Sequence, residues 1–125
     1  MNIQIPSFRT VKSKRGKYVV YLVQISFYEW VNVIEKRFSE FNELHETMKL
    51  IKKVIKKPIP KFLSKMRLKS FFKSLSETDL ENRRSGLETY IQSLETTECA
   101  KHSKFFPDFC GLSLRYRDLW ALSRP

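Results

Sequence analysis

One arginine of this chain stands where a helix would normally carry an apolar residue. Between residues 80 and 94, the apolar side chains Leu80, Leu87, Ile91 and Leu94 recur at helical spacing, and Arg83 falls on the same face. A guanidinium on a face that packs into a core needs an anionic partner. Arginine suits phosphate, because its planar fork donates two parallel hydrogen bonds and keeps its charge at ordinary pH. The position therefore favours a site for a phosphorylated ligand.

Two other segments offer groups that could complete such a site. Arg37 and Phe38 stand where a strand pattern changes to a helical pattern, and Lys61 follows the prolines Pro58 and Pro60. If the fold brings these places together with the arginine helix, they form a cationic pocket with an aromatic wall. The three glycines are scattered at 16, 86 and 111, so the chain has no glycine-rich phosphate loop. A phosphate site must then be built from side chains.

The sequence offers little for catalysis or for metal binding. His45 and His102 are its two histidines, and neither forms a recognisable pattern with a nucleophile, so packing is the better interpretation of His45. The spacing of Cys99, His102 and Cys110 matches no structural zinc site and lacks a fourth ligand. We therefore expect no enzyme, no metal site and no cofactor.

Composition limits the class of protein. The 125 residues are the size of one domain, and 42% hydrophobic residues are enough for a single packed core. Lysine and arginine number 24 against 13 aspartates and glutamates, which gives a formal net charge of +11. Such a charge favours nucleic acid, an anionic membrane or an acidic protein as partner, and charge alone does not choose among them.

The cellular compartment can be inferred from cysteine usage and from hydrophobicity. Two cysteines are too few for a disulfide framework and are typical of a reducing compartment. The first residues lack the basic start and the apolar run of a signal peptide, and no stretch approaches the roughly 20 apolar residues that span a bilayer. We expect a cytoplasmic protein that visits a membrane surface without crossing it.

Hydrophobic periodicity predicts an α+β fold that begins with strands. Residues 18–27 alternate so that one face is uniformly apolar, which is typical of a central strand. Residues 2–10 and 30–36 are expected to pair with it, although the second turn lacks a glycine. The pattern predicts a three-stranded antiparallel meander.

Helices are predicted for the rest of the chain. Apolar residues spaced by three and four indicate a helix from residue 38 to residue 55, with Ser39 as a candidate cap and a stop before Pro58. Ser76 is expected to cap the arginine helix. A helical turn or two within 61–75 and a short segment at 105–109 complete three to four helices with a proline-containing loop, and a last helix or packed tail follows.

Three segments together carry a resemblance to a known family. The run from Lys36 to Phe41 reads KRFSEF, the connector contains Lys61, and the run from Arg83 to Ile91 reads RRSGLETYI. In this order and spacing they resemble the motifs of the phox homology (PX) domain. The resemblance covers about residues 2–112 and leaves 113–125 as a C-terminal helix or packed tail. The opening IPSFR and the lack of a second domain resemble the small PX-only sorting nexins.

The resemblance implies a role for four residues. Arg37 matches the arginine that binds the 3-phosphate of phosphatidylinositol 3-phosphate, and Phe38 matches the aromatic residue on which the inositol ring stacks. Lys61 matches the lysine at the 1-phosphate, and Arg83 matches the arginine that hydrogen-bonds the 4- and 5-hydroxyls. The resemblance thus implies a monomeric phosphoinositide-binding module, peripheral on endosomal membranes, that serves membrane trafficking or sorting.

Some of these assignments have alternatives. The connector reads Pro58-Ile59-Pro60, shorter than the family's usual proline pattern, so Lys57 and Lys65 are alternatives to Lys61 as the loop cation. The helix arginine could instead pair with Glu40 or Glu43 in the core.

The segment after the connector is expected to lie beside the pocket, where PX domains insert a loop into the bilayer. We take Phe62, Leu63, Lys65 and Met66 as membrane-contact candidates, because apolar and cationic side chains both favour an anionic bilayer. The residues that follow at three-to-four spacing are expected in the core instead: Leu68, Phe71, Phe72 and Leu75.

Two other functions compete with lipid binding. The domain could be a protein-interaction scaffold with a degenerate lipid pocket, or a basic nucleic-acid binder that uses the lysines and phenylalanines of residues 49–73. The expected partners are a phosphoinositide head group, an anionic membrane surface and trafficking proteins, with no nucleic acid.

Overall fold

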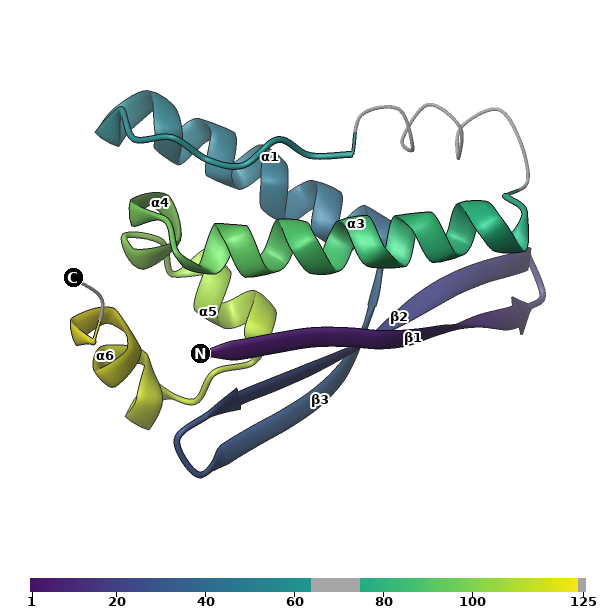
Figure 1. The fold of residues 1–125 in the computed structure, drawn as a ribbon, viewed down its shortest axis with the longest axis horizontal. Helices are drawn as coiled ribbons and strands as arrows, with labels where there is room; N and C mark the ends of the chain where they lie inside the picture. The colour runs from purple at the N-terminus through teal and green to yellow at the C-terminus, as the bar shows by residue number, and fades with distance from the viewer. Residues whose placement is uncertain (64–74, 124–125) are drawn as a thin grey trace.

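A three-stranded antiparallel sheet forms one side of the molecule. The computed structural model describes residues 1–63 and 75–123 (Figure 1). The strands β1 (Asn2–Ser13), β2 (Gly16–Phe27) and β3 (Trp30–Arg37) lie in the order β1-β2-β3. The predicted meander is therefore confirmed, and the predicted central strand lies at its centre.

Each turn between the strands contains a residue with a positive φ, a glycine in one turn and a tyrosine in the other. Gly16 has a φ of 120° in the β1–β2 turn, a conformation that glycine adopts without steric cost. In the β2–β3 turn, where the sequence has no glycine, Tyr28 takes a φ of 54°. The second turn therefore forms at some local cost, with the tyrosine ring packed edge-on against Phe27 at 4.6 Å between centroids.

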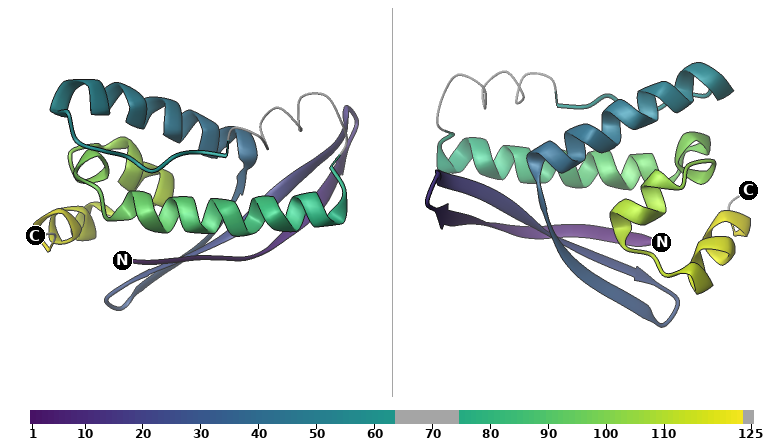
Figure 2. Two further views of the ribbon diagram at one scale, coloured as in Figure 1. Left: turned by 45° about the horizontal axis from the view of Figure 1, so that its top comes forward. Right: turned by 180° about the vertical axis from the view of Figure 1, so that it is seen from behind.

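Two long helices cover the apolar face of the sheet. Helix α3 (Glu77–Glu95) lies along β1, and α1 (Phe38–Ile55) packs beside it on the same side of the sheet (Figures 1 and 2). The strands turn Tyr21, Val23 and Ile25 toward these helices, and all three are buried. The helices bury the faces that their three-to-four spacing predicted: Phe41, Leu44 and Met48 from α1, and Leu87, Ile91 and Leu94 from α3.

Three shorter helices complete the described chain. They are α4 (Glu98–Lys101), α5 (Phe105–Cys110) and α6 (Leu114–Leu122). The single turn of α4 was not predicted, because four residues are too few to show a helical period. Tyr116 and Trp120 of α6 are buried in the same core cluster as the sheet and the long helices. The α+β fold class is confirmed.

The starts of the long helices differ in how well the sequence predicted them. Ser76 accepts a hydrogen bond from the Asp79 amide at 3.1 Å, as expected of a cap. The expectation that Ser39 caps α1 was wrong. The N-cap of α1 is Arg37, two residues earlier, and the Arg37 amide donates to the Glu40 carboxylate at 2.9 Å. Strand β3 thus passes into α1 with no intervening loop.

Beyond α1, the chain turns back along that helix. Lys56 ends the helix in a left-handed conformation with a φ of 57°, and its amide bonds to the Lys52 carbonyl at 2.9 Å. The connector through Pro58 and Pro60 then runs beside α1 as far as Leu63 (Figure 1). The helical turns expected within 61–75 fall largely outside the described residues, as do the core positions expected for Leu68, Phe71 and Phe72.

Within the described ranges, no helix combines the length and the apolar character that crossing a lipid bilayer requires.

The buried cysteines allow a test of the core. Cys99 and Cys110 are 0% exposed, and burial raises the pKa of the Cys110 thiol to about 12. At pH 8 a thiol with that pKa is ionised in about one molecule in ten thousand, and the thiolate is the reactive form. We expect both thiols to react with Ellman's reagent slowly in the native protein and fast in guanidinium chloride. Rapid native-state reaction of both would contradict this packing.

Candidate anion-binding pocket

The junction between β3 and α1 places the first arginine of the site. Arg37 is the last residue of β3, and its guanidinium lies over the Tyr18 ring of β2, 4.3 Å from the ring centroid. The Glu40 carboxylate accepts from the Arg37 amide and forms an ion pair with Lys36 at 3.5 Å. These contacts fix the backbone at the junction, while the Arg37 side chain stays exposed.

Helix α3 places the second arginine in the interior. Arg83 is 4% exposed, and its guanidinium lies over the ring of Phe38, 4.0 Å from the centroid. A cation over an aromatic face is stabilised by the ring quadrupole. Phe38 is the first residue of α1, so this contact joins the beginning of α1 to the second turn of α3.

Burial and neighbouring groups act on the ionisation of the buried arginine in opposite senses. Burial lowers the pKa of Arg83 from its ordinary value, whereas the Tyr21 phenol and the Asp79 carboxylate raise it. Burial also raises the pKa of Tyr21, which keeps the phenol neutral. Because the ordinary pKa of arginine lies far above neutral pH, the guanidinium stays charged at physiological pH.

The arginines and Phe38 share one cavity of about 620 Å³. It opens between the β1–β2 hairpin, the start of α1 and the start of α3. Its walls also include residues that sequence reasoning did not single out, among them a cation, a carboxylate and a tyrosine: Lys17, Glu77 and Tyr18. Three positive charges against one negative charge make this a cavity suited to an anion.

Strand register explains why Tyr18 and Lys17 were missed. Arg37 pairs with Val20 across β2 and β3, and Val20 in turn pairs with Arg9 across β1 and β2. Tyr18 lies two residues from Val20 on the same face, which puts it diagonally opposite Arg37. The sequence shows that these strands exist but does not show their register.

The structure does not bring Lys61 into this cavity. Lys61 lines a separate cavity of about 320 Å³ with His45, Lys49, Lys52 and residues of the connector. Lys57, the first alternative, lines a further cavity at the end of α1, and Lys65 lies outside the described residues. Among the described residues lining the arginine cavity, the lysine is Lys17.

The expectation that Phe62 contacts the membrane is corrected by its burial. Phe62 is 9% exposed and stacks between Phe38, at 5.5 Å, and His45, at 5.0 Å between centroids. Its ring also lies edge-on to Tyr90 at 4.8 Å. Aromatic packing of this kind contributes energy beyond area burial, which holds the side chain in the core.

Leu63 is partly buried. A Cβ atom built on Gly86 would come within 2.8 Å of the Leu63 Cδ2 atom, so the leucine packs against α3 at its glycine. Met66, the last apolar candidate for membrane contact, lies outside the described residues.

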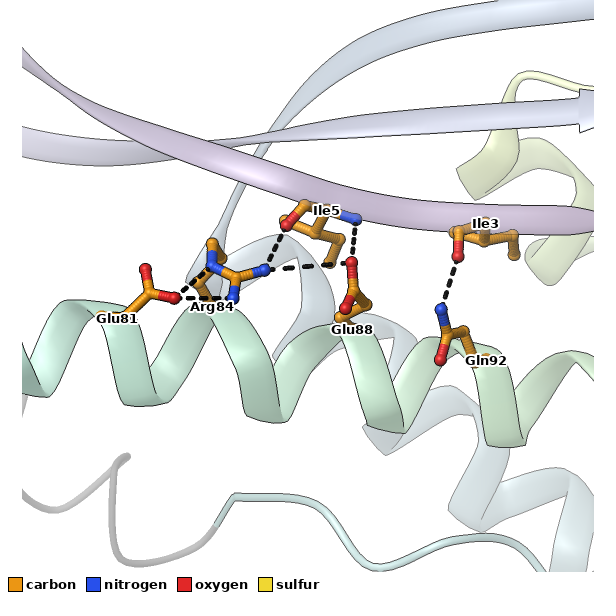
Figure 3. Close-up of polar contacts among 6 residues, drawn as sticks. All are labelled: Ile3, Ile5, Glu81, Arg84, Glu88 and Gln92. Carbon is orange, nitrogen blue, oxygen red and sulfur yellow. Dashed lines mark hydrogen bonds and ion pairs between the residues drawn. The ribbon is translucent and has the colours of Figure 1, made fainter.

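A polar network fixes α3 against β1 (Figure 3). Pro6 has no amide donor, and the β1–β2 register shifts between Gln4 and Ser7. Side chains of α3 bind the backbone there: Arg84 donates to the Ile5 carbonyl at 2.6 Å, and Glu88 accepts from the Ile5 amide at 2.7 Å (Figure 3).

Two further contacts extend this network. Glu81 accepts from Arg84 at 2.8 Å, and Gln92 donates to the Ile3 carbonyl at 2.8 Å (Figure 3). The network therefore fixes the helix that carries Arg83, one residue before Arg84.

Comparison with known proteins agrees with this architecture. The model of the PX domain family matches residues 27–113. Human sorting nexin-24 is 38% identical over 115 residues, and mouse sorting nexin-24 is equally similar. The match covers 90% of this chain and 60% of those proteins, so the chain spans about 60% of the length of these relatives.

Solved structures share the fold. The X-ray structure of a designed CISK-PX domain aligns with a TM-score of 0.68 at 24% identity and covers 87% of this chain and 97% of its own. The mouse SNX19 PX domain, crystallised with bound sulphate ion, aligns with a TM-score of 0.56 at 20% identity and covers 90% and 97%.

The fold and the cavity define a small α+β domain with a cationic pocket at the meeting point of its sheet and its long helices. Because the family model covers well over half of its residues, the chain belongs to the PX domain family. The curated relatives that it matches are named sorting nexins.

The network on β1 leads to a prediction about stability. Arg84→Ala removes a charged donor from the Ile5 carbonyl, and the loss of such a hydrogen bond costs about 1–3 kcal/mol. We expect a lower urea midpoint with an unchanged m-value. Arg115→Ala, which removes an exposed arginine from α6, is the control. Equal midpoints for the two variants would show that the network does not hold α3 in place.

Proposed function

We propose that the domain binds phosphatidylinositol 3-phosphate and thereby recruits the protein to endosomal membranes for trafficking or sorting. The observation that carries this proposal is the shared cavity of Arg37, Phe38 and Arg83, which come from two segments more than forty residues apart. The family motif and the cavity both include these three residues, whereas Lys61 belongs to the motif alone.

The two arginines differ in exposure, and each is proposed to contact a different part of the ligand. Arg37 is exposed at the wall of the cavity and is proposed to bind the 3-phosphate, for which a cation that solvent can reach is suitable. Arg83 is buried, and its guanidinium is proposed to donate to the 4- and 5-hydroxyls. A phosphate in place of either hydroxyl would bring added bulk against a packed wall, which gives selectivity for the 3-phosphate.

Phe38 is proposed to contact the inositol ring. Its packing against Arg83 and Phe62 holds the aromatic ring at the wall of the cavity without a ligand. A wall formed in advance lowers the ordering cost of binding. The bound sulphate ion in the mouse SNX19 PX domain supports binding of a tetrahedral oxyanion in this fold.

The cation for the 1-phosphate is a separate part of the proposal. Lys61 retains this role only if the connector moves toward the cavity, because it lines another cavity in the described conformation. Lys17 already lines the arginine cavity from the start of β2 and is the better-placed cation.

The proposed module is a monomer without enzymatic activity, formed by residues 2–112, with 113–125 as a C-terminal helix or packed tail. Lys65 and Met66 remain the proposed membrane contacts. With them, a cytoplasmic protein would bind reversibly to the bilayer surface.

Sedimentation with liposomes tests the proposal directly. We expect wild-type protein to sediment with vesicles that contain phosphatidylinositol 3-phosphate far more than with vesicles that lack it. Arg37→Ala should weaken this preference about 10- to 100-fold, because a charge-assisted bond to phosphate is lost. Arg115→Ala, an equal change of charge on α6, should not. Equal binding of wild type and Arg37→Ala to both kinds of vesicle would refute the proposal.

The acidic residue of the cavity offers a test in the opposite direction. Glu77 is exposed at the start of α3 and lines the cavity with the arginines, so its charge opposes an anionic ligand. Glu77→Gln should strengthen binding to the same vesicles several-fold. Glu43→Gln, an exposed carboxylate of α1 that does not line the cavity, is the matched control. Weaker binding by Glu77→Gln with an unchanged Tm would contradict this geometry.

A further inference from the structure

The last turns of α1 carry exposed apolar residues that the core does not use. Leu50 is 62% exposed and Val54 is 79% exposed, although each is large and aliphatic. Residues 50, 53 and 54 follow the spacing i, i+3, i+4, so Leu50, Lys53 and Val54 form one strip along α1. Lys57 lies two residues beyond the last helical residue and lines a cavity together with Lys53. We call these four residues the basic–apolar strip.

The strip faces away from the core. At 3.6 residues per turn, its helical members Leu50, Lys53 and Val54 lie opposite the face of Phe41, Leu44 and Met48, which are 0% exposed. Isolated apolar residues at a surface are common, but two in adjacent turns within a run of cations are less so.

Lysines line a cavity beside the strip. A cavity of about 570 Å³ opens at the end of α1, and its walls are made by five lysines and a proline: Lys49, Lys52, Lys53, Lys56, Lys57 and Pro58. Lys49 also forms an ion pair with Glu46 at 3.0 Å, which leaves a strong excess of positive charge. The surface thus combines a hollow lined by cations with a ridge of aliphatic side chains.

This surface lies far from the arginine cavity. Sixteen residues separate Phe38 from Val54, which corresponds to about 24 Å along the helix. Figure 1 and the left view of Figure 2 place the C-terminal end of α1 at the end of the molecule opposite the β1–β2 turn. A ligand in the arginine cavity and a partner on the strip can therefore be bound at the same time.

We propose that the basic–apolar strip and its lysine-lined hollow dock an acidic, amphipathic segment of a partner protein. Carboxylates of such a segment would enter the hollow between the lysines, and its apolar side chains would cover Leu50 and Val54. Charge complementarity requires a negatively charged partner. The aliphatic side chains of Leu50 and Val54 add selectivity for a segment with apolar residues at matching positions.

Two other anionic partners fit less well. Single-stranded nucleic acid is bound by stacking on aromatic residues, and the strip has none. A bilayer held by a head group in the arginine cavity would contact the opposite end of the molecule, an argument that rests on the proposed function. A peptide with apolar side chains covers Leu50 and Val54 better than either of these partners, so the apolar ridge favours a peptide.

The probe for this surface is a fluorescein-labelled synthetic helix of about four turns, with glutamates on one face and leucines on the other. A second peptide has the same glutamates with serines in place of the leucines. Fluorescence anisotropy at about 0.15 M salt, where long-range attraction is screened, gives both affinities. We expect the amphipathic peptide to bind at least about tenfold more tightly.

Variants assign the binding to the strip. Lys53→Glu/Lys57→Glu and Leu50→Ser/Val54→Ser change exposed side chains and should each weaken binding of the amphipathic peptide by about tenfold or more. The control Lys104→Glu/Arg115→Glu makes the same change of charge at the N-cap of α5 and on α6, and it should have little effect on peptide binding.

Binding to vesicles with phosphatidylinositol 3-phosphate, measured for the same variants, separates this proposal from the proposed function. Retained vesicle binding with lost peptide binding supports two independent sites. Equal affinity for the two peptides overturns the proposal, as does equal weakening by the control variant. Failure of the wild type to bind the amphipathic peptide overturns the proposal. If the strip variants then lose binding to anionic vesicles, the partner is a membrane; if they lose binding to a polyuridine oligomer, the partner is a nucleic acid.

Discussion

The burial of the Arg83 guanidinium is the constraint on which the rest of the site depends. With 4% of the residue exposed, the charge is removed from most of its water, and that removal is costly unless other groups compensate it. Phe38 under the guanidinium and Tyr21 beside it supply part of this compensation. Helix α1, helix α3 and strand β2 must therefore meet around one cation, and this meeting point forms a wall of the cavity.

The second requirement is a rigid frame for that meeting point. Strand β3 passes directly into α1 at Arg37, with the Glu40 carboxylate bound to its amide. On the other side, Arg84 and Glu88 hold α3 to the backbone of β1 beside Pro6. Both long helices begin at the cavity, where the positive ends of their dipoles add to the arginine charges. The pocket is thus built before any ligand arrives, which limits the cost of ordering it.

Helix α1 links this pocket to a chemically different surface. Its first turn contributes Phe38 to the cavity, and its last turns present lysines together with Leu50 and Val54. Between these turns of α1, Phe38 and His45 pack against the ring of Phe62. Cations thus line a cavity at each end of this helix. A domain of this size can then bind one anionic partner without blocking access to another.

The sequence by itself determined the strands, the long helices and the presence of an arginine suited to an anion. Alternation along residues 18–27 and three-to-four spacing in the helices fixed the α+β class, because burial of one face imposes these periods on the chain. Arg83 on an apolar face was likewise visible without coordinates. Tertiary structure alone decided which other residues join or leave the cavity. Strand register put Tyr18 beside Arg37, aromatic packing drew Phe62 inside, and the return of the connector along α1 took Lys61 elsewhere. These outcomes depend on contacts between segments distant in sequence, which no local pattern encodes.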